Sequence, residues 1–262
     1  GGNRFQEADA FSAWIQDDID LGALTLSPGV RYETIDGDWK DYASDATNTQ
    51  TNGKTGEIDA VVPGIGMTYA LSDSTNAFGG VYKGISTPSP RGFLKSGTRI
   101  EESIGYELGV RTQKDGASTE IAAFLSDYDE LTGSNAGLGA LAFDGMLDGT
   151  NAGEAEVKGI EFLQSYTANA DSSVAIPMFI SATYTDATLT APLSSGGEGD
   201  ILAADEPGAT IPYVPEWKFS VGAGLSAENW GLNAIGSYRS DMYASAKNLE
   251  VSNGREGKID GG

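Results

Sequence analysis

Apolar and polar residues alternate along much of the chain with a period of two. The clearest example is 103–111, in which every second residue is apolar: Ile104, Tyr106, Leu108 and Val110. Successive side chains of a strand point to opposite faces, so this alternation predicts a strand with one apolar and one polar face. Asp115 and Gly116 follow and supply the positive-φ residues of a tight turn, after which 119–128 returns as a second strand. The segment 103–128 is therefore predicted to be a hairpin.

The same unit recurs along the whole chain. Paired strands are predicted at 11–19 and 24–35, 60–70 and 77–84, 103–111 and 119–128, 157–166 and 175–187, and 217–225 and 231–243. The two strands of each pair are joined by a short turn. Successive pairs are separated by long polar loops, at 36–59, 86–97, 129–156 and 188–215. A polar stretch at 244–262 follows the last pair and is expected to remain unpaired.

Short turns that alternate with long loops are rare in compact soluble domains. They are the rule in outer-membrane barrels, which have short periplasmic turns and long extracellular loops. Several tyrosines also lie near the loop ends of the predicted strands: Tyr32, Tyr82, Tyr128, Tyr184, Tyr238 and Tyr243. Any one of them alone would be ordinary in a strand, and it is their shared position that favours a membrane barrel. The pattern therefore predicts an all-β fold, an antiparallel up-and-down transmembrane β-barrel of which this chain supplies about ten consecutive strands.

Composition removes several other classes of protein. The chain has neither cysteine nor histidine, which excludes a disulfide framework, a thiolate metal site and a Ser-His-Asp triad. A carboxylate pair acting as acid and base stays open, but no spacing singles one out, and we expect no enzyme activity and no cofactor. The net charge of −22 argues against nucleic acid as a partner. No apolar run approaches the length of a membrane helix, so any membrane crossing must be made by strands.

The acidic residues concentrate in the predicted loops. The loop 129–156 contains no basic residue and six acidic ones: Asp129, Glu130, Asp144, Asp148, Glu154 and Glu156. Such oxygens suit Ca²⁺, but no EF-hand spacing is present, and the pattern favours a solvated acidic surface over a cation site. We therefore assign no metal site.

One segment is basic within this acidic chain. No acid occurs from 74 to 100, whereas Lys83, Arg91, Lys95 and Arg99 lie there. A local positive field would attract an anionic ligand, and arginine pairs well with carboxylate or phosphate groups. The alternative is that these bases only balance the neighbouring acidic loops.

Taken in order, five stretches resemble the barrel of TonB-dependent outer-membrane receptors. They read WIQDDIDLGALTLSPGVRYE, GIGMTYALSDSTNAFGGVYKG, YELGVR, VKGIEF and IPYVPEWKFSVGAGL. A sixth stretch, YASAKNLEVSNGREGKID, lies near the end of the chain. It is similar to the loop that precedes the last three strands in the ferric-citrate (dicitrate) type of siderophore receptor. The resemblance covers essentially the whole chain.

The resemblance implies a barrel of twenty-two strands in the bacterial outer membrane, filled by an N-terminal plug, that imports a ferric chelate with energy from TonB. Residues 1–262 would then be a partial barrel domain, with the plug and the final strands absent. The implied partners are a ferric chelate, TonB acting through the absent plug, and outer-membrane lipid. A porin-like channel is the nearest alternative, and a secreted β-rich binding module is a more distant one.

Four arginines are candidates for contact with the ligand. The resemblance places Arg4 just before the first strand, where the ferric-citrate receptors offer an arginine to the chelate. Arg91 and Arg99 come from the basic segment, and Arg239 ends a strand on its polar, lumen-facing side. The alternation further predicts which side chains face outward (Tyr106, Leu108, Phe219 and Val221) and which face inward (Glu107, Arg111, Lys218 and Ser220).

Overall fold

The computed structural model describes all residues except 1–2, 44–46, 88–99, 133–150, 192–206 and 251–256. The long strands are β1 (Asn3–Gln16), β3 (Leu24–Tyr42), β4 (Gln50–Ser72), β5 (Thr75–Ser86), β6 (Glu101–Lys114), β7 (Ala117–Thr132), β8 (Asn151–Ala168), β9 (Val174–Leu189), β10 (Trp217–Ala227) and β11 (Gly231–Arg239). Three short strands are β2 (Ile19–Leu21), β12 (Met242–Tyr243) and β13 (Lys258–Ile259). Within the described ranges, no helix is long and apolar enough to cross a membrane.

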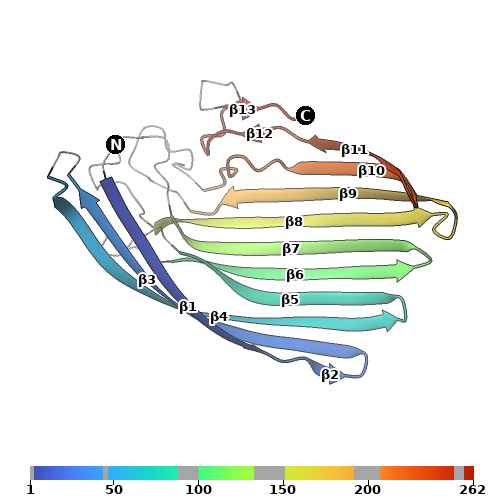
Figure 1. Ribbon diagram of the computed structural model, residues 1–262, viewed down its shortest axis with the longest axis horizontal. Helices are drawn as coiled ribbons and strands as arrows, with labels where there is room; N and C mark the ends of the chain where they lie inside the picture. Colours follow the sequence, from blue (N-terminus) through green and yellow to red (C-terminus); the bar gives the residue numbers. More distant parts are fainter. Residues whose placement is uncertain (1–2, 44–46, 88–99, 133–150, 192–206, 251–256) are drawn as a thin grey trace.

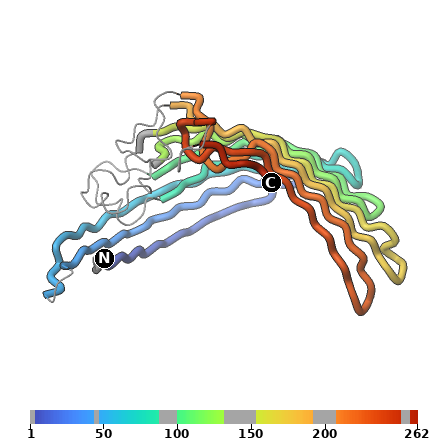
Figure 2. The backbone as a smooth tube through the Cα atoms, turned by 90° about the horizontal axis from the view of Figure 1, so that it is seen from above, coloured from blue at the N-terminus to red at the C-terminus, as the bar shows by residue number. Residues whose placement is uncertain are grey.

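The long strands form one antiparallel sheet in which neighbours in sequence are neighbours in space. Its order is β1-β3-β4-β5-β6-β7-β8-β9-β10-β11, with β2 paired beside β3 (Figure 1). Seen from above, with the strands running across the view, the sheet bends into an arc (Figure 2), and its two end strands β1 and β11 do not pair with each other. The predicted up-and-down arrangement of ten consecutive strands is confirmed.

The turns between paired strands use the residues that the sequence offers for them. Asp115 and Gly116 have φ values of 50° and 76°, and Lys114 pairs directly with Ala117. This is the backbone of a two-residue turn with positive φ at both central positions, which matches the twist of the strands it joins. Gly22, with φ 78°, serves the turn before β3.

The predicted loop at 36–59 is wrong, because most of it is strand. β3 continues to Tyr42 and β4 begins at Gln50, and the two pair along this length, with Asp36 opposite Glu57 and Asp38 opposite Thr55. Beyond Ile35 the two strands carry mainly polar residues on both faces, with the buried Trp39 as an exception. They therefore lack the alternation by which strands are recognised.

The expectation that 244–262 remains unpaired is also wrong. β12 pairs with β13, and Gly262 exchanges two backbone hydrogen bonds with Arg239 at the end of β11, with N–O distances of 2.9 and 3.1 Å. The returning chain packs over the ends of β8 and β9, where Ala155, Leu189 and Ala246 form a buried cluster. The region beyond the sheet therefore contains a small core of its own.

Asn248, in the stretch 244–262, is hydrogen-bonded to Thr210 in the segment that precedes β10. Its side chain accepts a hydrogen bond from Thr210 N at 2.7 Å and donates to Thr210 O at 3.0 Å, much as a backbone partner in a sheet would. Its own backbone has φ 49°, a left-handed conformation that asparagine tolerates better than most residues.

Candidate functional site

One face of the sheet is apolar from β1 to β11. Directly opposed residues of antiparallel strands share a face, and the register brings Tyr106 opposite Leu125, Leu108 opposite Ala123, and Val221 opposite Ile180. Many of these side chains are exposed in the chain, including Leu108 at 61% and Val221 at 56%. Large continuous apolar surfaces of this kind mark contact with protein or membrane.

The apolar face ends at a line of charge on the side of the long loops. On eight successive strands, from β1 to β9, the first charged residue of this face toward the loops is Asp9, Asp36, Asp59, Lys83, Glu102, Asp127, Lys158 and Asp186. We call this line the charged boundary. Below it the strands continue for between seven residues, on β1, and thirteen, on β4, a range that includes the length of a membrane-crossing strand. A band of this height with a charged edge is what a bilayer requires of a barrel wall.

Members of the charged boundary bind one another across strands. Lys83 Nζ lies 2.7 Å from Glu102 Oε1, and Lys158 Nζ lies 3.7 Å from Asp186 Oδ2. The Tyr32 hydroxyl donates to Asp59 Oδ1 at 2.6 Å. These contacts hold the charged groups at the edge of the apolar band rather than above it.

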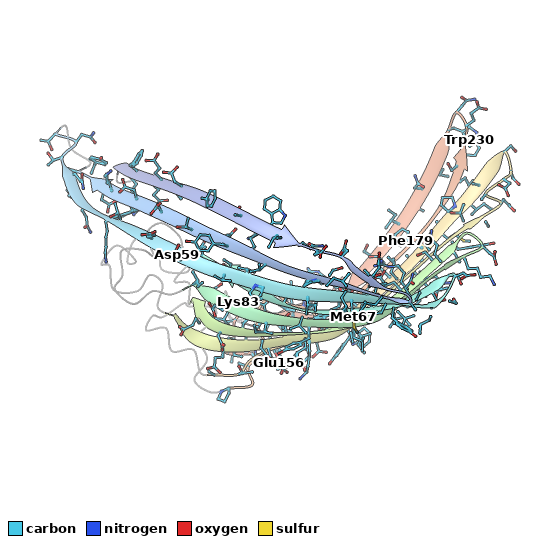
Figure 3. All side chains as sticks on the ribbon, turned by 90° about the horizontal axis from the view of Figure 1, so that it is seen from below. Asp59, Met67, Lys83, Glu156, Phe179 and Trp230 are labelled. Carbon is cyan, nitrogen blue, oxygen red and sulfur yellow. The ribbon has the colours of Figure 1, made fainter. Side chains whose placement is uncertain are left out.

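The opposite face is polar and rich in glycine. Figure 3 shows the sheet as a curve, with Met67 and Glu156 of the first face on its outer side and Phe179 of the second toward the inside. We therefore call the second face the inner face. A hollow of about 720 Å³ crosses it over β1 to β6, floored by Gly29, Gly64 and Gly80.

The predicted facing of individual side chains is confirmed. The register puts Tyr106 and Leu108, together with Phe219 and Val221, on the apolar face. Glu107, Arg111, Lys218 and Ser220 lie on the inner face. Hydrogen bonding supports this, because the Ser220 and Ser237 hydroxyls lie 3.2 Å apart.

The arginines of the inner face mostly have acidic partners. Arg111 Nε binds Glu120 Oε2 at 2.5 Å across the β6–β7 pair, and Arg31 Nη2 lies 2.6 Å from Glu33 Oε1. Such pairs leave less charge available to a ligand. They explain why an inner-face arginine is not by itself a binding residue.

Of the predicted site residues, two are described by the structure. Arg4 lies within β1 rather than before it, so its expected place is wrong, and its Nε lies 3.5 Å from Asp41 Oδ1. Arg239 ends β11 on the inner face, as expected. Arg91 and Arg99, with Lys95, lie outside the described residues.

Lys83 is the one cation of the predicted basic segment that the structure describes. Its side chain lies on the outer face and binds Glu102, so it does not contribute to a positive field on the inner side of the wall. The signal was present in the sequence, because Lys83 is two residues after Val81 and must share its face.

Sequence reasoning missed one neighbour of Arg239. Lys218 of β10 lies directly opposite it across the β10–β11 pair. The two residues are separated by a turn and most of two strands. Their register could be known only once the pairing of the strands was fixed.

The geometry thus defines a class of protein: one sector of a membrane barrel wall, with lipid on one side and a polar lumen on the other. Residues 2–261 match the family model described as TonB dependent receptor-like, beta-barrel, and the chain belongs to this family. The family is one of outer-membrane transporters rather than enzymes.

Solved structures of such receptors share the fold. The ferric citrate transporter FecA in its unliganded form matches with a TM-score of 0.74 and 21% identity over 100% of this chain and 37% of FecA. The ferric-catecholate import receptor Fiu from K12 E. coli gives 0.71 and 15% over 100% of this chain and 38% of Fiu. The ferric yersiniabactin uptake receptor FyuA from Yersinia pestis gives 0.72 and 14%, with 100% and 38% covered. The chain therefore spans less than two-fifths of the length of each.

Proposed function

We propose that this chain is part of the barrel of a receptor that imports a ferric chelate across the outer membrane with energy supplied through TonB. The observation that carries this proposal is the family match over residues 2–261, combined with structural likeness to three receptors whose names state an iron chelate as cargo. The outer face, with its apolar band and charged boundary, suits a protein embedded in lipid. It does not suit a secreted binding module, whose surface would face water on both sides.

This chain would form part of the wall of the transport pathway. Its outer face contacts lipid, its inner face lines the lumen, and the segments beyond the charged boundary meet the ligand first. The plug and the contact with TonB belong to the remaining part of a receptor that is more than twice as long. The ten-strand arc would be completed by the other strands of a barrel of about twenty-two, since lipid tolerates no unpaired strand edge.

The cargo that we propose is an anionic ferric chelate of the citrate type. The ordered resemblance to the ferric-citrate receptors supports this choice, as does the presence of arginines at the loop side of the barrel. Arg239 is the best placed of them, because it lies on the inner face and binds no carboxylate among the described residues. Arg4 is partly neutralised by Asp41, so it would contribute only if that contact opened. Arg91 and Arg99 remain candidates from the sequence.

The proposal is tested by iron uptake. The full-length receptor is expressed in a bacterium that lacks its own siderophore receptors, and uptake of radioactive iron is measured with ferric citrate, a ferric catecholate and a ferric hydroxamate, with and without TonB. We expect uptake of at least one chelate, strongest for ferric citrate, that disappears without TonB. Equal uptake with and without TonB would indicate a passive porin-like channel, and no uptake of any ferric chelate would reject iron import.

A further inference from the structure

Two positive charges face each other on the inner face. Lys218 of β10 and Arg239 of β11 are directly opposed, and both side chains are exposed. Like charges in this position destabilise a sheet, because their Cβ atoms are only about 5 Å apart. In a chain with 38 acidic and 16 basic residues, chance would more readily supply a carboxylate than a second cation.

The pair is not neutralised by the acids around it. Among the described residues, neither Lys218 nor Arg239 forms an ion pair, whereas Arg31 and Arg111 of the same face each bind a glutamate. The guanidinium of Arg239 reaches only the Met242 sulfur, at 3.5 Å, and thioether sulfur is a weak acceptor.

Of the nearby carboxylates, Glu216 lies two residues before Lys218 but forms no ion pair with either cation among the described residues, and the others are engaged elsewhere or lie on a further strand. Asp241 accepts a hydrogen bond from Gly261 N at 2.7 Å and lies 3.6 Å from Lys258 Nζ. Glu161 of β8 shares the inner face, but Thr183 of β9 stands between it and Lys218. The two cations therefore keep their charge available.

Hydroxyl groups line the wall beside the two cations. Thr183 lies directly opposite Lys218, and the next row of the inner face consists of Ser181, Ser220 and Ser237. The Ser220 and Ser237 hydroxyls are within hydrogen-bond distance of each other, so one donates to the other and the accepting hydroxyl keeps its own hydrogen for a further acceptor. Two cations beside a row of hydroxyls form a surface that matches an oxygen-rich anion.

We propose that Lys218 and Arg239 together bind a carboxylate group of the imported ligand on the inner wall, at the loop end of β10 and β11. This inference rests on the proposed function and names one contact within it. The planar guanidinium of Arg239 suits the two oxygens of a carboxylate, and the ammonium of Lys218 adds a point charge beside it. Bound ligand would also relieve the repulsion between the two cations, so the site is stabilised when it is occupied.

The test compares variants of the full-length receptor in binding to ferric citrate. The variants are Lys218→Gln, Arg239→Gln and the double substitution. Lys114→Gln, at the turn end of β6, removes the same charge far from the site and serves as the control. A cationic ferric hydroxamate is the comparison ligand. Correct folding is checked by outer-membrane location and heat-modifiable gel mobility.

We expect each single variant to bind ferric citrate about tenfold or more weakly, and the double variant to be weaker still. Binding by Lys114→Gln should match wild type, and the cationic chelate should bind the double variant no worse. In a separate measurement, iron-free citrate should protect Lys218 of the wild-type receptor from an amine-modifying reagent, as read by mass spectrometry. This readout requires neither iron nor transport.

The outcomes separate the site from the proposed function. Wild-type affinity for ferric citrate in the double variant, or no protection of Lys218, would overturn the site even if another ferric chelate is imported. Protection of Lys218 by citrate in a receptor that imports no ferric chelate would uphold the anion site and reject iron import. A loss of affinity for both chelates in a correctly folded double variant would also overturn the site, because it would not be selective for charge.

Discussion

Tyr82 of β5 lies directly opposite Gly105 of β6, and its ring covers the glycine on the inner face. A Cβ built on Gly105 would lie 2.5 Å from Tyr82 Cζ and 2.6 Å from Cε2. The same arrangement recurs at Phe78 over Gly109, Phe124 over Gly159 and Phe179 over Gly222. All four pairs join strands that are separated in sequence by a long connecting segment.

These pairs supply a test of packing in the wall. Replacing Gly105 by alanine should destabilise the barrel by about 1–3 kcal/mol, because the new methyl group and the Tyr82 ring compete for one space. Combining Gly105→Ala with Tyr82→Ala should recover part of the loss, which is the mark of a direct contact. The measurement is urea unfolding of the full-length receptor in lipid vesicles. If Gly105→Ala costs as much in the Tyr82→Ala background as alone, the ring is not the cause.

The assignment of the two faces gives a second prediction. Val221 lies on the apolar face and its neighbour Ser220 on the inner face. An arginine at Val221 would enter lipid and should cost about 2–4 kcal/mol, whereas one at Ser220 would enter the lumen and should cost much less. Unfolding free energies of Val221→Arg and Ser220→Arg, measured in the same vesicles, provide a matched pair. The reverse order would show that the faces are exchanged, and equal costs would contradict the assignment of one face to lipid.

Much of this wall could be predicted because strand alternation is a local property. The facing of Tyr106 and Glu107, or of Val221 and Ser220, follows from their neighbours in sequence alone. The extension of β3 and β4 up to Tyr42 and Gln50 could not be predicted in this way, because polar residues dominate both of its faces. Asp36 and Asp59 mark where the apolar band ends, but no local pattern shows that the two strands continue beyond it.

The functional surface was less accessible to prediction, since it depends on contacts between distant segments. Arg239 was recognised from its place on a strand, but its opposition to Lys218 depends on strand register. The contact between Asn248 and Thr210 joins residues 38 positions apart and follows from no periodic pattern. Lys83 is different, because its outward facing follows from its position two residues after Val81 on the same strand.

The bidentate contact of Asn248 predicts how the returning chain is held. Replacing Asn248 by alanine removes both hydrogen bonds to Thr210 and leaves a left-handed φ that alanine disfavours. We expect faster hydrogen exchange at the Thr210 amide and at the amides of β12, with no change in β6 or β7. Asn248→Asp keeps an acceptor for Thr210 N but loses the donor to Thr210 O. Its exchange rates at these amides should therefore fall between those of wild type and of Asn248→Ala. Unchanged exchange at Thr210 in the alanine variant would reject this role.

The β12–β13 hairpin contains a cluster of charges that should make it sensitive to pH. The Tyr243 hydroxyl donates to Glu250 Oε1 at 2.8 Å, and Lys258 Nζ lies 3.4 Å from Glu250 Oε2. The hydrogen bond from Tyr243 and then the charge of Lys258 lower the pKa of Glu250 below its ordinary value. The charge of Glu250 in turn raises the pKa of Lys258, and its hydrogen bond with Tyr243 raises the pKa of that hydroxyl.

The direction of the pH effect follows from these shifts. A carboxyl whose folded pKa lies below its unfolded value contributes stability above the unfolded value, and loses that stability as pH falls through the folded one. Glu250 should therefore hold the hairpin at neutral pH and release it in acid, below the ordinary glutamate pKa of about 4.3. Lys258 acts at the alkaline end of the pH range, because its contribution to the stability of the hairpin is lost only as pH rises through its raised pKa.

Hydrogen-exchange protection of the β12 and β13 amides in the full-length receptor, corrected for intrinsic rates, measures this opening. Protection should be greatest at neutral pH and fall as pH is lowered toward 3, while protection in β6 and β7 stays constant. Glu250→Gln cannot change its charge, so the same amides should be less protected at neutral pH and lose little more in acid. Because all three side chains are exposed or nearly so, salt should weaken the effect by screening. Identical pH profiles for wild type and Glu250→Gln would show that another group controls the hairpin.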